Sequence, residues 1–117
     1  MKQYRLYCRD VFSAAPVAVA DRFGTRLCGL MFRRALPPGA GLLLVRCSSI
    51  HCCFMRFVID AVYLDRDLRV VGVETVRPWR LGGHFAHARH VLELNEHAAS
   101  ALVPGDVLCQ EELGEKQ

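Results

Sequence analysis

The sequence lacks any hydrophobic run that approaches the roughly 20 residues needed for a membrane-spanning helix. It also lacks internal repeats and low-complexity segments. These absences exclude a helical membrane protein, a repeat array and a disordered chain. The chain has 117 residues, of which 52% are hydrophobic and 23% charged. This size and composition predict one globular domain over residues 1–117.

The sequence also lacks the short motifs that usually mark a metal site or a reactive nucleophile. It contains no Cys-x-x-Cys, no His-Glu-x-x-His, no glycine-rich phosphate loop and no Gly-x-Ser-x-Gly turn. His84, His87 and His90 are spaced three apart, and on a helix adjacent pairs could share a metal. Gly82 and Gly83 before them favour a loop instead. We therefore predict no metal and no cofactor, and we assign no catalytic residue.

Charge of neither sign dominates the chain. The formal net charge is +3, and arginine supplies 13 of the 15 basic residues. This excess is spread along the sequence, and Glu111, Glu112 and Glu115 form a short acidic tail over residues 111–117 that offsets part of it. Proteins that bind nucleic acids usually concentrate basic charge on one face. We therefore predict no nucleic-acid partner and no membrane partner, and the sequence does not indicate an oligomeric state.

Six cysteines occur at irregular spacing. A chain of this size and hydrophobicity does not need disulfides, and Cys8, Cys28 and Cys47 have apolar neighbours, where a free cysteine packs as a small hydrophobe. The segment from Val11 to Ala20 resembles a secretion signal, but Asp10 borders it and the preceding residues alternate as a strand does. We therefore predict free thiols and a cytoplasmic protein.

Short strands with turn signals at close intervals dominate the pattern. Helices are expected only from Asp21 to Arg34, where apolar residues recur at helical spacing, and from Asn95 to Leu102, with Asn95 as the cap. The expected fold is mainly β (α+β), an antiparallel β-sandwich or partly closed barrel with two short helices. The predicted strands cover residues 3–9, 16–20, 42–45, 51–57, 59–64, 69–76, 91–94 and 107–111.

Asp60 is a single carboxylate inside the nearly unbroken apolar run from Phe54 to Leu64. Burying a charge is costly unless the charge is paired and hydrogen-bonded. Asp60 is therefore either a structural acceptor, with an arginine such as Arg33 as the expected charged partner, or a functional carboxylate in a cleft. Because the sequence offers no clear second catalytic group, we favour the structural interpretation.

Several short motifs occur in a characteristic order. Over residues 17–109 they resemble the bacterial and archaeal domain of unknown function 192, also called uncharacterised protein family 0127. The resemblance implies a compact β-rich fold with one early helix, and no established activity, cofactor or substrate. Members of that family usually have glycine where this chain has Leu68 and His97. The motifs are Gly29-Leu30-Met31-Phe32-Arg33, His51, Phe54-Met55-Arg56-Phe57, Ile59-Asp60, Arg77-Pro78-Trp79-Arg80, Val91-Leu92-Glu93-Leu94 and Pro104-Gly105-Asp106.

The leading functional hypothesis is a non-catalytic binding module for a small polar or anionic ligand. Its cleft would be lined by Arg33, Arg56, Asp60, Trp79 and Arg80, because guanidinium groups bind anions and an exposed tryptophan stacks on planar groups. A competing interpretation is that Trp79 closes one end of the fold while the arginines extend over it.

Two other classes of function remain open. One is a hydrolase-like enzyme that uses Asp60 together with a loop histidine such as His84. The other is a protein-interaction adaptor that has no cleft. A histidine within hydrogen-bond reach of Asp60 would favour the enzyme, and a flat apolar patch would favour the adaptor.

Overall fold

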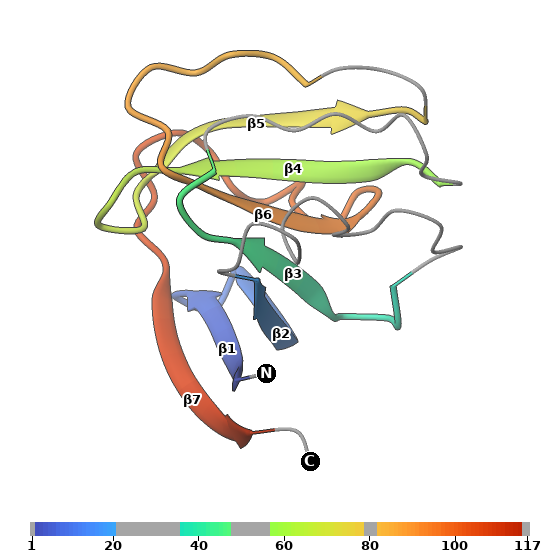
Figure 1. Ribbon diagram of the computed structural model, residues 1–117, viewed down its shortest axis with the longest axis vertical. Helices are drawn as coiled ribbons and strands as arrows, with labels where there is room; N and C mark the ends of the chain where they lie inside the picture. Colours follow the sequence, from blue (N-terminus) through green and yellow to red (C-terminus); the bar gives the residue numbers. More distant parts are fainter. Residues whose placement is uncertain (1, 21–35, 48–56, 79–81, 116–117) are drawn as a thin grey trace.

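The computed structural model describes residues 2–20, 36–47, 57–78 and 82–115, which form a single seven-stranded sheet (Figure 1). No helix occurs among these residues, and none of them forms a helix that could cross a membrane. The strands are β1 (Lys2–Cys8), β2 (Phe12–Ala20), β3 (Gly41–Leu44), β4 (Ile59–Leu64), β5 (Val70–Val76), β6 (His90–Asn95) and β7 (Cys109–Glu115).

The strand order is β5-β4-β6-β3-β2-β1-β7. Every neighbouring pair is antiparallel except β2 and β3, which are parallel, with Val17 opposite Gly41. The sheet is therefore mixed and not purely antiparallel as predicted. It is also not closed into a barrel, because β5 and β7 are its edges and only an isolated bridge between Arg69 and Val107 joins their flanking residues.

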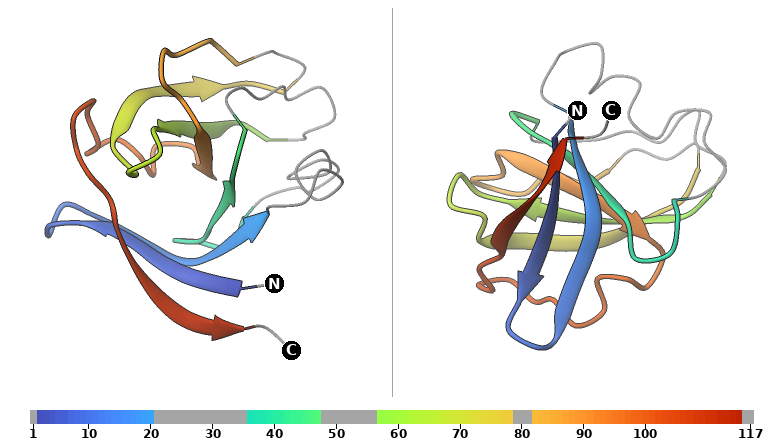
Figure 2. Two further views of the ribbon diagram at one scale, coloured as in Figure 1. Left: turned by 60° about the vertical axis from the view of Figure 1, so that its left-hand side comes forward. Right: turned by 90° about the horizontal axis from the view of Figure 1, so that it is seen from below.

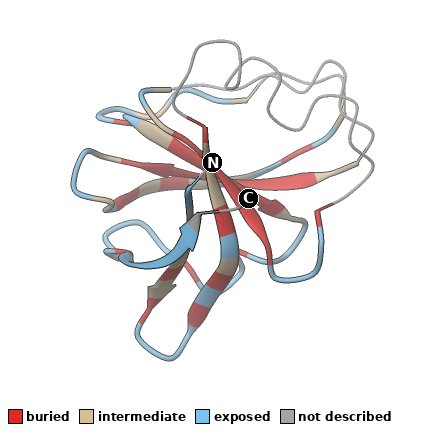
Figure 3. Ribbon diagram, turned by 60° about the horizontal axis from the view of Figure 1, so that its bottom comes forward, coloured by how far each residue is buried: buried red, intermediate tan, exposed pale blue. Residues whose placement is uncertain are grey.

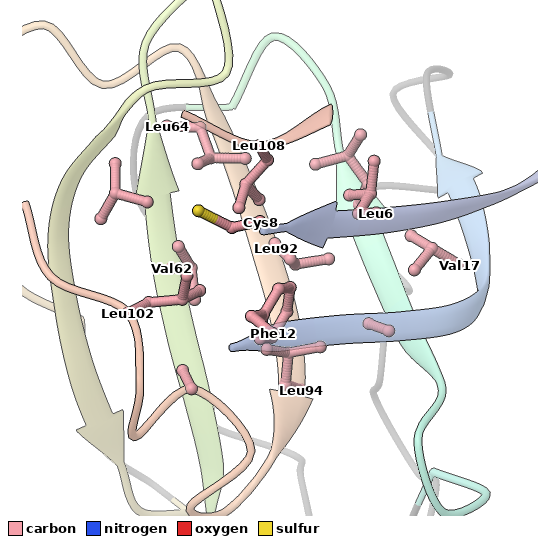
Figure 4. Packing of buried hydrophobic residues seen from close by; sticks show 14 residues of the cluster. Leu6, Cys8, Phe12, Val17, Val62, Leu64, Leu92, Leu94, Leu102 and Leu108 are labelled. Carbon is pink, nitrogen blue, oxygen red and sulfur yellow. The ribbon is translucent and has the colours of Figure 1, made fainter. Parts of the chain in front are cut away.

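The sheet curls strongly, so that β1 and β2 pack across β4 and β6 (Figure 2). Residues from the two halves meet in the cluster drawn in Figure 4, where Leu6 and Phe12 face Val62 and Leu92. We call the side of the sheet that carries this cluster the first face. Burial of these side chains removes apolar surface from water, which is the main force that stabilises the curl.

The opposite side of the same strands carries another apolar cluster, and we call it the second face. It includes Ile59, Ala61 and Tyr63 from β4 and Val91 from β6. All six residues of β4 are therefore buried, although side chains alternate between the faces of a strand. This two-sided burial explains why β4 has an almost continuous apolar sequence. In Figure 3 burial is concentrated on the central strands, whereas β7 is exposed.

The predicted helix from Asn95 to Leu102 is wrong, because β6 runs on to Asn95 and is followed by turns. The side chain of Asn95 does not cap a helix. Its Oδ1 accepts a hydrogen bond from the Leu36 amide at 3.3 Å, and its Nδ2 donates to the Leu36 carbonyl at 3.0 Å. The backbone of His97 has a φ of 73°, which is incompatible with a right-handed helix.

Some of the other sequence predictions concern residues that the structure describes and can be compared with it, whereas others do not. The helix from Asp21 to Arg34 and most of the strand at 51–57 lie outside the described residues. The last strand is longer than predicted, since β7 extends through the acidic segment to Glu115. Leu68 and His97, where the family resemblance implies glycine, both adopt positive φ, 64° and 73° respectively. These turns therefore keep the left-handed backbone that glycine accommodates without steric cost.

Candidate functional site

Asp60 lies near the start of β4 and points to the first face. Its side chain is buried, with 4% of the residue exposed. Its Oδ1 accepts a hydrogen bond from the Thr75 hydroxyl at 2.9 Å, and its Oδ2 accepts one from the Ala99 amide at 3.1 Å. The predicted burial and hydrogen bonding are therefore confirmed. Both described donors are neutral, and among the described residues no arginine forms an ion pair with Asp60.

The register of the sheet explains these contacts. Asp60 is paired with Thr75 of β5 on one side and with Leu94 of β6 on the other. Directly opposed side chains lie on the same face of a sheet. Ala99 belongs to the turns that follow β6, and it packs in the first cluster. Asp60 therefore fastens this connection to the sheet, which is a structural task.

His84 belongs to a segment that lies on the other side of β4. Its neighbour Phe85 packs against Tyr63, with ring centroids 4.4 Å apart, and a Cβ added at Gly72 would overlap the Phe85 ring. The amide of Gly83 donates to both carboxylate oxygens of Glu74 at 3.0 Å. Tyr63 and Phe85 belong to the second cluster. The sheet therefore separates this segment from Asp60, and the structure does not bring the proposed acid and base together.

The remaining candidates, Arg33, Arg56, Trp79 and Arg80, lie outside the described residues. On either side of each of their segments, the nearest described residues that pack in a hydrophobic cluster belong to the second cluster or pack against it. None of these flanking residues belongs to the first cluster, which carries Asp60. The flanking residues are Ala20 and Leu36, Cys47 and Phe57, and Val76 and Phe85.

Glu93 is a second buried carboxylate, which the sequence analysis did not single out. It is 3% exposed and lies in β6 between Ala61 of β4 and Leu42 of β3, both of which belong to the second cluster. Tyr63 is on the same face and is fully buried. The signal for Glu93 was present in the sequence, since one acid in the apolar strand Val91–Leu94 is the same pattern that drew attention to Asp60.

The histidines of the 82–90 segment are not arranged as metal ligands. His84 and His87 are exposed, and the Nδ1 atom of His90 accepts a hydrogen bond from the Arg46 amide at 3.1 Å. Among the described residues, no group of three His, Cys, Asp or Glu side chains lies close enough to hold a metal ion. Chemically, the described residues thus offer one structural carboxylate on the first face and one buried carboxylate on the second.

The curled open sheet defines a fold class with solved members. The chain is similar to a protein of unknown function from Novosphingobium aromaticivorans, with a TM-score of 0.79 and 20% sequence identity over 92% of this chain and 83% of that one. At this identity the likeness shows the fold alone.

Sequence comparison identifies the family. The chain is 39% identical over 80 residues to UPF0127 protein PH1112 from Pyrococcus horikoshii, covering 66% of this chain and 70% of that protein. It is 36% identical over 83 residues to UPF0127 protein PYRAB11210 from Pyrococcus abyssi, covering 66% and 68%. The DUF192 family, described as "Uncharacterized ACR", matches residues 8–109. The chain therefore belongs to DUF192, a family whose function is not established, and the resemblance noted in the sequence is confirmed.

Proposed function

We propose that this DUF192 protein is a non-catalytic binding domain for a small polar or anionic ligand, and that the ligand site is on the second face. Arg33, Arg56 and Arg80 bind the anionic group, and Trp79 stacks on a planar part of the ligand. Glu93 holds an arginine in the orientation that the ligand requires. Asp60, which the sequence grouped with these residues, belongs to the scaffold of the first face.

The observation that supports this proposal concerns the three segments that contain Arg33, Arg56, Trp79 and Arg80. All three are attached to the same face of the sheet. Each of them leaves from and returns to residues that pack in or against the second cluster. We infer from this common attachment that arginines far apart in the sequence meet at the second face.

Glu93 supplies the electrostatic argument. A buried carboxylate in an apolar cluster is destabilising unless it is paired, and guanidinium is the partner best suited to such sites because its planar fork donates two hydrogen bonds to one carboxylate. Glu93 lies on the face to which the arginine-bearing segments are attached. A Glu93–arginine pair would fix one guanidinium and leave its remaining donors for a ligand.

Neither alternative function receives comparable support. The hydrolase hypothesis needs Asp60 and a loop histidine together, whereas the segment that contains His84 packs on the opposite face from Asp60. The adaptor hypothesis needs a continuous exposed apolar patch. The described part of the chain exposes only four large apolar residues, Val11, Val103, Val107 and Leu113.

A thermal-shift screen against a library of small metabolites, followed by calorimetric titration of the hits, tests the proposal. Substituting Arg33, Arg56 or Arg80 by Gln should weaken binding of a hit by about tenfold or more, equivalent to about 1.4 kcal/mol. Arg66→Gln is the matched control, because Arg66 is exposed in the β4–β5 turn. Asp60→Asn should retain the affinity. Equal losses in Arg66→Gln, or unchanged affinity in all three arginine variants, would contradict the proposal.

We also propose that the protein works in the reducing cytoplasm. Cys8 and Cys109 are free thiols, and cytoplasmic proteins generally keep their thiols reduced. Alkylation of the unfolded, unreduced protein followed by intact-mass measurement should show all six cysteines labelled. Protected pairs in freshly purified protein would argue for an oxidising compartment.

A further inference from the structure

Three strand ends meet at one end of the sheet, on the left of Figure 1. The chain leaving β3 is joined to the start of β6 by a hydrogen bond from the Cys47 amide to the Arg89 carbonyl at 2.8 Å. The Arg89 amide donates to the carbonyl of Leu64, the last residue of β4, at 2.7 Å. The backbone around Arg46 and Arg89 is therefore held by two other strands and is well defined.

His90, the first residue of β6, follows Arg89 in the chain and accepts a hydrogen bond from the backbone of Arg46. The Arg46 amide donates to its Nδ1 at 3.1 Å, with Arg46 in a left-handed conformation at a φ of 57°. A ring nitrogen that accepts a hydrogen bond carries no proton, so the neutral imidazole has its proton on Nε2. The contact with Arg46 thus leaves Nε2–H as a donor on the opposite edge of the ring.

Positive charge accumulates around this imidazole. Burial, the charge of Arg89 and the charge of Arg46 lower the pKa of His90, while Asp65 from the end of β4 acts in the opposite direction. The Asp65 Oδ1 atom is already used by the turn after β4, where it accepts from the Asp67 and Arg69 amides at 2.8 and 2.9 Å. Neither exposed guanidinium, of Arg46 or Arg89, forms an ion pair with another described residue.

We propose that Arg46, Arg89 and His90 form a binding site for a phosphate-type oxyanion at this end of the sheet. The two guanidinium groups supply charge and paired donors, and the Nε2–H of His90 supplies a third donor from a half-buried, fixed ring. A tetrahedral oxyanion accepts hydrogen bonds from several directions at once, so it can engage all three donors. This site uses none of the residues of the ligand site proposed above, and each proposal can fail without the other.

Binding at this site should be coupled to protonation of His90. An anion beside the ring favours the imidazolium, because opposite charges stabilise each other. The charged groups that face His90 are Arg46 from the end of β3, Arg89 on its own strand and Asp65 from the end of β4. Bound phosphate opposes the effect of the two arginines and should raise the pKa of His90.

Titration of inorganic phosphate into the protein, followed by NMR of the histidine ring protons at constant ionic strength, tests the proposal. The signal of His90 should shift saturably and its pKa should rise, whereas the signal of exposed His97, which lies elsewhere beside Glu96, should not follow. A parallel titration with a phosphomonoester distinguishes free phosphate from a phosphorylated metabolite as the preferred form. An identical response of His90 to chloride would overturn the proposal.

Matched double variants separate a site from general positive charge. Arg46→Gln/Arg89→Gln should weaken phosphate binding by about tenfold or more. Arg66→Gln/Arg77→Gln removes the same charge from exposed positions and should leave the affinity within about twofold. His90→Asn, whose side-chain oxygen can still accept from the Arg46 amide, should keep the fold and lose only part of the affinity. Equal weakening in both double variants would show that net charge alone attracts the anion.

Discussion

The two faces of the sheet carry one buried carboxylate each among the described residues, Asp60 in β4 and Glu93 in β6, and the surroundings of the two differ. On the first face, Asp60 accepts from the Thr75 hydroxyl and the Ala99 amide, under a cluster closed by β1 and β2. On the second face, Glu93 lies between Ala61 of β4 and Leu42 of β3, which belong to the second cluster. A buried acid in a strand therefore does not by itself indicate function. Its face, and what is attached to that face, decides the interpretation.

The largest expected effect compares leucines on opposite faces. Leu92→Ala on the first face and Leu44→Ala on the second should each lower the free energy of unfolding by about 2–5 kcal/mol, since both leave a cavity in a cluster. Leu92 is fully buried in the larger cluster and should lie near the upper end of the range. Urea unfolding measures both. A larger loss for Leu44→Ala would show that the second face is the more tightly packed.

Asp60→Ala should cost about 1–3 kcal/mol, because it leaves the buried Ala99 amide without an acceptor. Asp60→Asn should cost less, since its oxygen can accept from Ala99 while the Thr75 hydroxyl turns to accept from the new amide. Urea midpoints of both variants, with Thr75→Val as the control for the hydroxyl contact, separate the contributions. An unchanged midpoint in Asp60→Ala would refute the structural role of Asp60.

Gly72→Ala tests how closely the 82–89 segment lies on the second face. The added methyl group would overlap the Phe85 ring, and overpacking of this kind usually costs about 1–3 kcal/mol. Phe85→Leu in the same chain should recover part of the loss, because the smaller side chain leaves room for the methyl group. Thermal unfolding of the single and double variants provides the comparison. Strictly additive losses would show that Phe85 does not cover Gly72.

His97→Gly should raise stability by about 0.5–1 kcal/mol, because glycine relieves the strain of a positive φ but also gains freedom in the unfolded chain. The weak contact between exposed His97 and Glu96, at 3.6 Å, contributes little in return. Glu96→Gly, at a position without positive φ, is the control and should lower stability. Differential scanning calorimetry resolves both changes.

The smallest expected effect is the pH dependence caused by His90. Its pKa is lowered in the folded protein, so the unfolded chain binds the proton more readily. Stability should therefore be complete above the ordinary histidine pKa of about 6.5 and should decline as the pH falls below it. Solvent screening keeps the effect small at this half-exposed ring. His90→Asn should flatten this component when urea midpoints are compared from neutral to mildly acidic pH.

The strands of the central sheet could be predicted from sequence because their signals are local. The apolar run of β4 and the turn after it locate the β4–β5 hairpin closely. The parallel pairing of β2 with β3 could not be foreseen, because it depends on a long connection and not on the composition of either strand. The side-chain amide of Asn95 suits a helix cap, so the sequence predicts one. The same amide group also suits the long-range hydrogen bonds that it makes with the backbone of Leu36.

Most of the candidate site stays a prediction, because Arg33, Arg56, Trp79 and Arg80 lie outside the described residues. Burial of Asp60 follows from its apolar neighbours, but its partners do not, since no local pattern indicates that the Ala99 amide will face it. Charge complementarity suggests an arginine, whereas the two donors found among the described residues are neutral. Glu93 was missed because its strand is short and its acid was counted only as part of a motif. A search for every single acid within an apolar strand would have found both.

The contact between Gly72 and Phe85 has an evolutionary consequence. The ring occupies the space that a side chain at position 72 would need, so the two positions share one volume. Relatives with a larger residue at the position of Gly72 should have a smaller one at the position of Phe85. The two substitutions should therefore occur together in the same relative. Such paired substitutions would record, across the family, that the 82–89 segment is built to lie against this sheet.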